Sequence, residues 1–174
     1  MLHVTNGDAA ADLIRRSGVG GIVLPWRDVL HEGPVPAQLD DAALRRERAA
    51  FLARLGEGDA DKIERLLAQR DEILASFDLH EEVVLWFEHD LYDQLQILQI
   101  LDRFAAVDRG EVVLTMICIG DHPRVARFNG LGQLAPEDLG ELFDDRALVS
   151  EDEIELAEIA WQAFRSPDPT LLER

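Results

Sequence analysis

Four short runs of apolar residues along the chain each end at a cluster of small and polar residues. The runs, residues 2–5, 21–25, 83–87 and 112–119, are rich in the aliphatic residues typical of strands. The clusters that follow them are Asn6-Gly7-Asp8, Trp26-Arg27-Asp28, Glu88-His89-Asp90 and Gly120-Asp121-His122. Parallel strands of an open α/β sheet bring their carboxyl ends to one edge, where ligands bind. The pattern therefore predicts a binding or active site at that edge.

Helical patterns separate the predicted strands. Residues 8–16 read as a short helix capped by Asp8, and glycines then admit a second strand that Pro25 ends. A strand, a helix of about ten residues and a second strand indicate a parallel pair. Between residues 41 and 77 apolar positions recur at helical spacing, with glycines near the middle. We interpret residues 38–78 as a helical insertion or lid.

The second half of the chain continues the same alternation. The third strand, residues 82–87, is apolar almost throughout, as expected of a central strand covered on both faces. Asp90 and Asp93 are placed to cap the helix that follows it. Residues 111–119 read as a fourth strand.

Two helices then close the chain, at residues 136–143 and 151–164, and Ser150 with Glu153 forms a capping box for the second. The fold class predicted is α/β, with three layers and a mostly parallel central sheet of about four strands. We expect one domain over residues 1–174, in which residues 136–174 begin a segment that is cut short.

The charge of the chain is strongly acidic. Thirty-five Asp and Glu face 17 Lys and Arg, for a net charge of −18 at pH 7. Such a field repels phosphate backbones, so we expect no affinity for duplex nucleic acid. A solvated surface explains most of the excess, and adaptation to a high-salt host is an alternative.

Cys118 is the only cysteine, so no disulfide can form within the chain, and it is expected to pack as a small apolar residue. The first residues carry no basic region followed by a long apolar stretch. No window approaches the roughly 18 apolar residues that a membrane span needs. We expect a cytoplasmic protein with no membrane partner.

The first candidates for chemistry are His89, Asp90 and Asp93, at the junction of the third strand and its helix. An imidazole beside two carboxylates suits general acid–base catalysis, with a carboxylate orienting the ring. The alternative for the two aspartates is helix capping alone.

A second group, Asp28, His31 and Glu32, lies in a loop bounded by prolines and glycine. With His89 and Asp93 it could form a divalent-metal site, but the spacing matches no specific metal motif. A solvated loop is the alternative, and the metal remains unknown.

The first turn supplies further candidates for ligand binding. Gly7 would let a ligand approach the backbone closely between Asn6 and Asp8. Arg27 could neutralise a phosphate or carboxylate of a ligand, and Trp26 could stack on a planar group or pack in the core. Trp161 is expected to pack in the core.

Three segments carry a resemblance to a known family. They are His3-Val-Thr-Asn-Gly-Asp8, Leu24-Pro-Trp-Arg-Asp-Val-Leu-His-Glu-Gly-Pro-Val-Pro36 and Leu85-Trp-Phe-Glu-His-Asp-Leu-Tyr-Asp-Gln-Leu95. In this order they resemble the bacterial family catalogued as domain of unknown function 1835, over roughly residues 1–120. The resemblance implies no activity, substrate or cofactor.

Two hypotheses about function follow. The first is a small-molecule site at the strand ends, in a hydrolase or group transferase that acts on a phosphorylated or nucleotide-like compound. The second is a non-catalytic regulatory or protein-interaction module. Whether the chain is an enzyme, and which reaction it performs, is not decided by the sequence.

Overall fold

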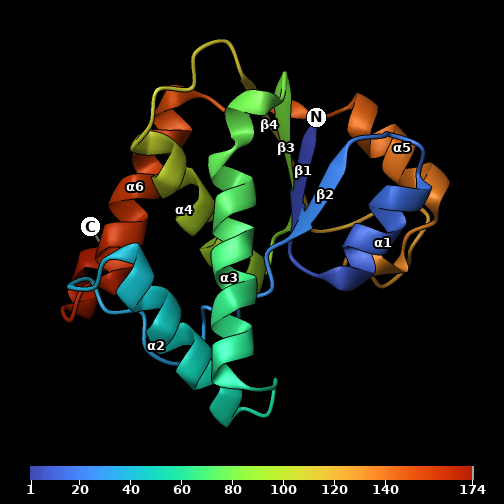
Figure 1. Cartoon of the computed structure of the whole chain (residues 1–174). Coiled ribbons are helices and arrows are strands. Elements are labelled where there is room, and N and C mark those ends of the chain that lie inside the picture. Colours follow the sequence, from blue (N-terminus) through green and yellow to red (C-terminus); the bar gives the residue numbers. More distant parts are fainter. Residues whose placement is uncertain (174) are drawn as a thin grey trace.

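A five-stranded sheet forms the middle of three layers in the computed structural model, which describes residues 1–173 (Figure 1). The strands are β1 (Leu2–Thr5), β2 (Ile22–Pro25), β3 (Glu82–Glu88), β4 (Val113–Ile119) and β5 (Ala147–Leu148). Their order in the sheet is β2-β1-β3-β4-β5, and the first four are parallel. β5 pairs antiparallel with β4.

Helices cover both faces of the sheet. They are α1 (Asp8–Arg16), α2 (Asp41–Arg54), α3 (Ala60–Ala75), α4 (Leu91–Ala105), α5 (Pro136–Asp144) and α6 (Glu151–Arg165), with short 3₁₀ turns η1 (Phe77–Leu79), η2 (Leu131–Gln133) and η3 (Pro169–Glu173). In Figure 1, α1 and α5 lie on one face, and α3, α4 and α6 lie on the other. α2 packs on α3, so the two form a hairpin beside the sheet.

Two apolar cores follow from the alternation of side chains along β3. Val83, Leu85 and Phe87 belong to the core under α3, α4 and α6, whereas Val84 and Trp86 belong to the core under α1 and α5. All five are fully buried. β3 is thus a central strand covered on both faces, and the predicted fold class is confirmed. Trp161 is buried in a third cluster, also as predicted.

The strand β5 is not predicted from the sequence. It consists of two residues, Ala147 and Leu148, which are too few to show an alternating pattern. The strand exists because its backbone pairs with Thr115 and Met116 of β4, a contact between distant parts of the chain.

Two of the predicted helix caps, Asp90 and Ser150, are confirmed, and two, Asp8 and Asp93, are wrong. The side chains of Asp90 and Ser150 accept the expected hydrogen bonds at the starts of α4 and α6. Asp8 does not cap α1; Gly7 is the N-cap residue and Asp8 is the first helical residue.

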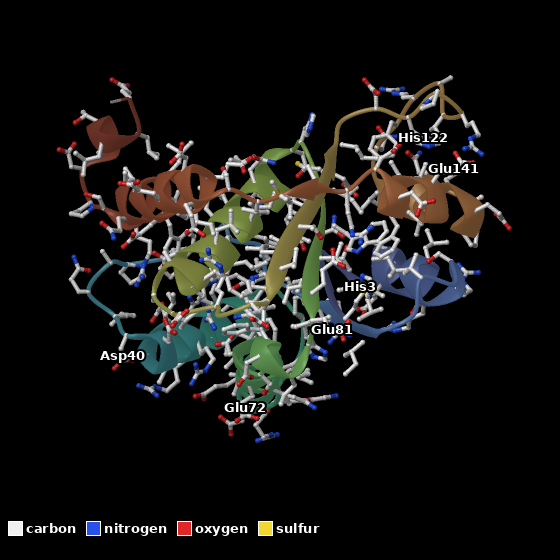
Figure 2. All side chains as sticks on the ribbon, turned by 90° about the horizontal axis from the view of Figure 1, so that it is seen from above. His3, Asp40, Glu72, Glu81, His122 and Glu141 are labelled. Carbon is white, nitrogen blue, oxygen red and sulfur yellow. The ribbon has the colours of Figure 1, made fainter. Side chains whose placement is uncertain are left out.

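The surface carries the acidic excess, as Asp40, Glu72 and Glu141 illustrate at the periphery of Figure 2. Within residues 1–173, no helix combines the length and the apolar character that crossing a membrane requires. Cys118 is half-buried with a free thiol, and burial raises its pKa.

Candidate functional site

The carboxyl ends of β1 to β4 lie at one edge of the sheet, because these four strands are parallel. The four polar clusters that end the strands are therefore at the same edge, as predicted. In sheets with this strand order the usual ligand crevice lies between the ends of β1 and β3.

The chain itself packs at that crevice. The Leu131 backbone N–H donates to the Glu88 carboxylate over 2.6 Å, and Leu131 is fully buried. A Cβ atom on Gly130 would come within 2.9 Å of the same carboxylate, and the Gly130 φ of 148° is one that other residues rarely adopt. The segment around η2 thus packs against α1 and the end of β3.

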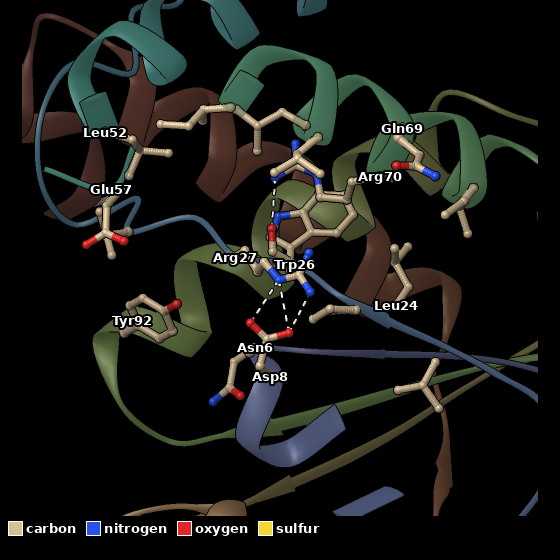
Figure 3. A pocket seen from close by; sticks show the side chains of 18 of the residues that line it. Asn6, Asp8, Leu24, Trp26, Arg27, Leu52, Glu57, Gln69, Arg70 and Tyr92 are labelled. Atoms are coloured by element: carbon tan, nitrogen blue, oxygen red, sulfur yellow. Dashed lines mark hydrogen bonds and ion pairs between the residues drawn. The ribbon is translucent and has the colours of Figure 1, made fainter. Parts of the chain in front are cut away.

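A cavity of about 550 Å³ lies between the ends of β1 and β2 and the α2–α3 hairpin (Figure 3). Its lining comprises Asn6, Gly7, Asp8, Val23, Leu24, Pro25, Trp26, Arg27, Val29, Leu52, Leu55, Glu57, Ile63, Leu66, Leu67, Gln69, Arg70, Ile73 and Tyr92. Both sides are mainly apolar, and each contributes three charged or amide side chains: Asn6, Asp8 and Arg27 from the strand ends, and Glu57, Gln69 and Arg70 from the hairpin. The cavity therefore combines a largely apolar lining with a few polar groups.

Arg27 and Asp8 form an ion pair at the strand-end side of the cavity. The Arg27 Nε lies 3.0 and 3.1 Å from the two carboxylate oxygens of Asp8, and its Nη2 lies 2.5 Å from one of them. The hydrogen bond from Arg27 holds the pKa of Asp8 below its usual value. Among residues 1–173, Arg27 is the one non-glycine with a positive φ, at 50°. Such conformations concentrate at ligand sites, where the surrounding structure enforces them.

Charged contacts fix the hairpin to the sheet. The Arg70 guanidinium lies 3.9 Å from the centre of the Trp26 ring and donates to the Trp26 carbonyl oxygen. Asp71 accepts hydrogen bonds from Arg45, Arg70 and Arg103. Burial raises the pKa of Asp71, but the arginines outweigh it and the net shift is downward. These contacts anchor the hairpin as a fixed wall.

Trp26 itself belongs to the core. It is fully buried, and its indole N–H donates to Gln99 over 2.8 Å. Arg70 covers one of its faces. Of the two interpretations of Trp26, stacking on a ligand or packing in the core, these contacts favour packing.

Asp28 lies outside the cavity lining. Its carboxylate accepts from Nη2 of Arg48 at 2.7 Å, and both side chains are 1% exposed. Arg48 also donates to the backbone carbonyls of Val29 and Glu32. Asp28 and Arg48 thus hold the loop that follows β2 in place from its inner side.

His31 and Glu32 are exposed on that loop. The His31 ring packs edge-on against Tyr92, with ring centroids 5.6 Å apart, and Tyr92 lines the cavity. His31 therefore lies behind Tyr92, and neither His31 nor Glu32 lines the cavity.

His89 is exposed and also lies outside the cavity lining. Its Nε2 is 3.0 Å from the backbone carbonyl of Cys118, and its ring packs on Gly120. Within residues 1–173 no carboxylate hydrogen-bonds to the His89 ring, so the prediction that one orients it is wrong; the Asp90 and Asp93 carboxylates accept backbone N–H groups instead.

Asp93 is buried behind the cavity instead of capping α4. Its carboxylate accepts from the Asn6 amide at 2.9 and 3.1 Å and from the Glu88 backbone N–H at 2.6 Å. Burial, partly offset by the bond from Asn6, raises the pKa of Asp93 to about 7. Asp93 contacts the cavity only through Asn6.

A single site at this edge would bring the side chains of Asp8, Asp28, His31, His89 and Asp93 into one cleft. Of these five residues, only Asp8 lines the cavity. Four other residues predicted to bind a ligand also line the cavity: Asn6, Gly7, Trp26 and Arg27.

Sequence reasoning missed Tyr92, Glu57 and Arg70. Tyr92 had a readable signal, since it lies in the first turn after β3. Glu57 and Arg70 reach the cavity only through the packing of the hairpin against β2, which no local pattern shows.

Within residues 1–173, no three His, Cys, Asp or Glu side chains are grouped as they would need to be to hold a metal ion. The comparisons add no relative: no family model, curated protein or solved structure matches the chain.

Proposed function

We propose that the protein binds a small organic molecule in the cavity between β2 and the α2–α3 hairpin. The observation that carries this proposal is the cavity, about 550 Å³ in volume, with a mainly apolar lining that includes a few polar side chains. Small-molecule sites in proteins have such volumes, and combine apolar surroundings with a few oriented polar groups.

The first turn of the chain supports the proposal. Nothing lies within 4 Å of where a Cβ of Gly7 would stand, so a ligand can reach the backbone between Asn6 and Asp8. Arg27 is about half exposed and keeps guanidinium surface for the ligand. We assign ligand contact to Asn6, Gly7, Asp8 and Arg27, and support of the rim to Asp28, His31 and Glu32.

A tryptophan at the mouth of the cavity tests this function. Leu66 lines the cavity and is 45% exposed, so Leu66→Trp should fill the space without disturbing the core. We expect benzyl alcohol to shift the amide NMR signals of β2 and α3 in the parent and to lose at least about tenfold in affinity in the variant.

Leu156→Trp is the matched control, because Leu156 is exposed on α6 outside the cavity lining. It should bind benzyl alcohol like the parent. Equal binding by parent and Leu66→Trp would contradict a site in this cavity.

A second candidate function is catalysis, by a hydrolase or group transferase acting on a phosphorylated or nucleotide-like compound. The observation in its favour is Asp93, whose raised pKa suits proton transfer and whose hydrogen-bond partner Asn6 lines the cavity. Asp90 and His89 would then act from the adjoining turn. Catalysis by His89 requires a substrate that extends beyond the cavity, since its ring faces Cys118.

We also retain three narrower proposals. Membership of the family of domain of unknown function 1835 rests on the three segments quoted above, and a cytoplasmic location rests on the single cysteine. Absence of duplex nucleic acid binding rests on the charge of −18. A regulatory module, which binds a ligand or a protein partner without turnover, is compatible with the cavity.

A further inference from the structure

We infer that the ligand of the cavity is a small zwitterion, an apolar body that carries both an amine and a carboxylate. The inference rests on the proposed function and goes on to name the chemical class of the ligand. It follows from the charges on the cavity lining.

The lining holds four charged side chains, two of each sign: Asp8, Arg27, Glu57 and Arg70. Arg70 is almost wholly buried, and Asp71 and the Trp26 carbonyl accept its hydrogen bonds. A ligand therefore meets mainly Asp8, Arg27 and Glu57.

Glu57 offers a solvent-exposed carboxylate that is free to pair with a ligand. Among residues 1–173 its carboxylate has no hydrogen-bond or ion-pair partner. Its backbone is nevertheless fixed, because its N–H donates to the Leu52 carbonyl at the end of α2 and Gly56 adopts a φ of 92°. The hairpin turn thus fixes the backbone of this exposed residue at the rim of the cavity, whose lining includes Glu57 (Figure 3).

Arg27 offers the complementary donor. The Nε and Nη2 atoms of Arg27 donate hydrogen bonds to Asp8, whereas Nη1 of Arg27 makes no hydrogen bond within residues 1–173. A ligand carboxylate can add to this free nitrogen without displacing Asp8.

A phosphate ester fits these charges poorly. Its dianion would meet two carboxylates, Asp8 and Glu57, around one already paired guanidinium, in a protein of charge −18. A zwitterion that reaches both side chains would pair its amine with Glu57 and its carboxylate with Arg27. Its apolar part packs against the leucines and isoleucines of the hairpin.

Four probes with the same phenyl body test the inference by titration calorimetry: L-phenylalanine, phenethylamine, 3-phenylpropanoate and phenyl phosphate. We expect L-phenylalanine to bind most tightly, by about tenfold over either singly charged analogue.

Two variants assign the two charges. Glu57→Gln should weaken L-phenylalanine and phenethylamine about tenfold and leave 3-phenylpropanoate unchanged, whereas Arg27→Gln should weaken L-phenylalanine and 3-phenylpropanoate only. Glu72→Gln, an exposed change on α3 outside the lining, is the matched control and should bind every probe like the parent. A cooperative thermal transition in each variant verifies folding.

The outcomes separate the two proposals. If L-phenylalanine binds no better than benzyl alcohol, or if Glu57→Gln leaves it unchanged, the zwitterion is wrong while the cavity still binds benzyl alcohol. Tightest binding of phenyl phosphate overturns the inference in favour of a phosphorylated ligand. Failure of benzyl alcohol to bind the parent overturns the proposed function as well.

Discussion

Arg48→Met is expected to lower the free energy of unfolding by about 3–5 kcal/mol, the usual cost of leaving a buried charge unpaired. Arg48 and Asp28 are each 1% exposed, and no solvent can take the place of the lost partner. The same substitution removes the donors to the Val29 and Glu32 carbonyls, so the loop after β2 loses its inner support. Urea titration of parent and variant measures the loss.

The double variant Asp28→Leu/Arg48→Met tests whether the unpaired buried charge causes the loss of stability. Once both charges are gone, no ion remains unpaired in the core, so the double variant should be clearly more stable than Arg48→Met alone. The backbone carbonyls still lack donors, and recovery should therefore be incomplete. If the losses of stability measured for Asp28→Leu alone and for Arg48→Met alone simply add up to the loss of the double variant, the two side chains are not coupled and the explanation is wrong.

The fold was readable from the sequence because its main signals are local. The parallel strands, the break between α2 and α3 and the capping box at Ser150 each follow from spacing within a few residues. β5 was not readable, since a two-residue strand exists only by pairing with β4. Strand order was likewise unreadable, because it depends on contacts between segments far apart in the chain.

The site was readable only in part, for the same reason. The turn at Asn6 and the positions of Trp26 and Arg27 follow from where β1 and β2 end, and they do line the cavity. The predicted residues do not line one cleft, because two contacts between distant parts of the chain cannot be predicted from the sequence. The Leu131 backbone donates to Glu88, and Arg48 reaches across from α2 to take up Asp28.

The second large effect concerns pH and Asp93. Its folded pKa of about 7 lies above its ordinary value of 3.8, so in the unfolded chain it loses its proton at lower pH than in the fold. Between about pH 4 and pH 7 the unfolded state therefore binds fewer protons, and stability from this group falls as pH rises. A difference of about three units corresponds to at most about 4 kcal/mol. Well above pH 7, Asp93 is ionised in both the folded and the unfolded state, so its contribution to stability no longer changes with pH.

Asp93→Asn isolates this effect, since asparagine has a similar size and does not titrate. The stability of the variant relative to the parent should rise as the pH increases from 4 to 7 and then level off, as measured by urea unfolding at a series of pH values. A relative stability that stays flat over this range would show that Asp93 is ionised in the fold.

Asn6→Ala should increase the pH dependence of stability that Asp93→Asn removes, because Asn6 is a hydrogen-bond donor to Asp93. The Asn6 amide donates to both oxygens of Asp93 and favours the charged form. Without that donor the pKa of Asp93 should rise further, and the loss of stability should extend to higher pH than in the parent. Carbon NMR of the Asp93 carboxyl group follows the titration directly, near pH 7 in the parent and higher in Asn6→Ala. A midpoint that moves downward would mean that Asn6 does not stabilise the carboxylate, and the link from the cavity to Asp93 would be lost.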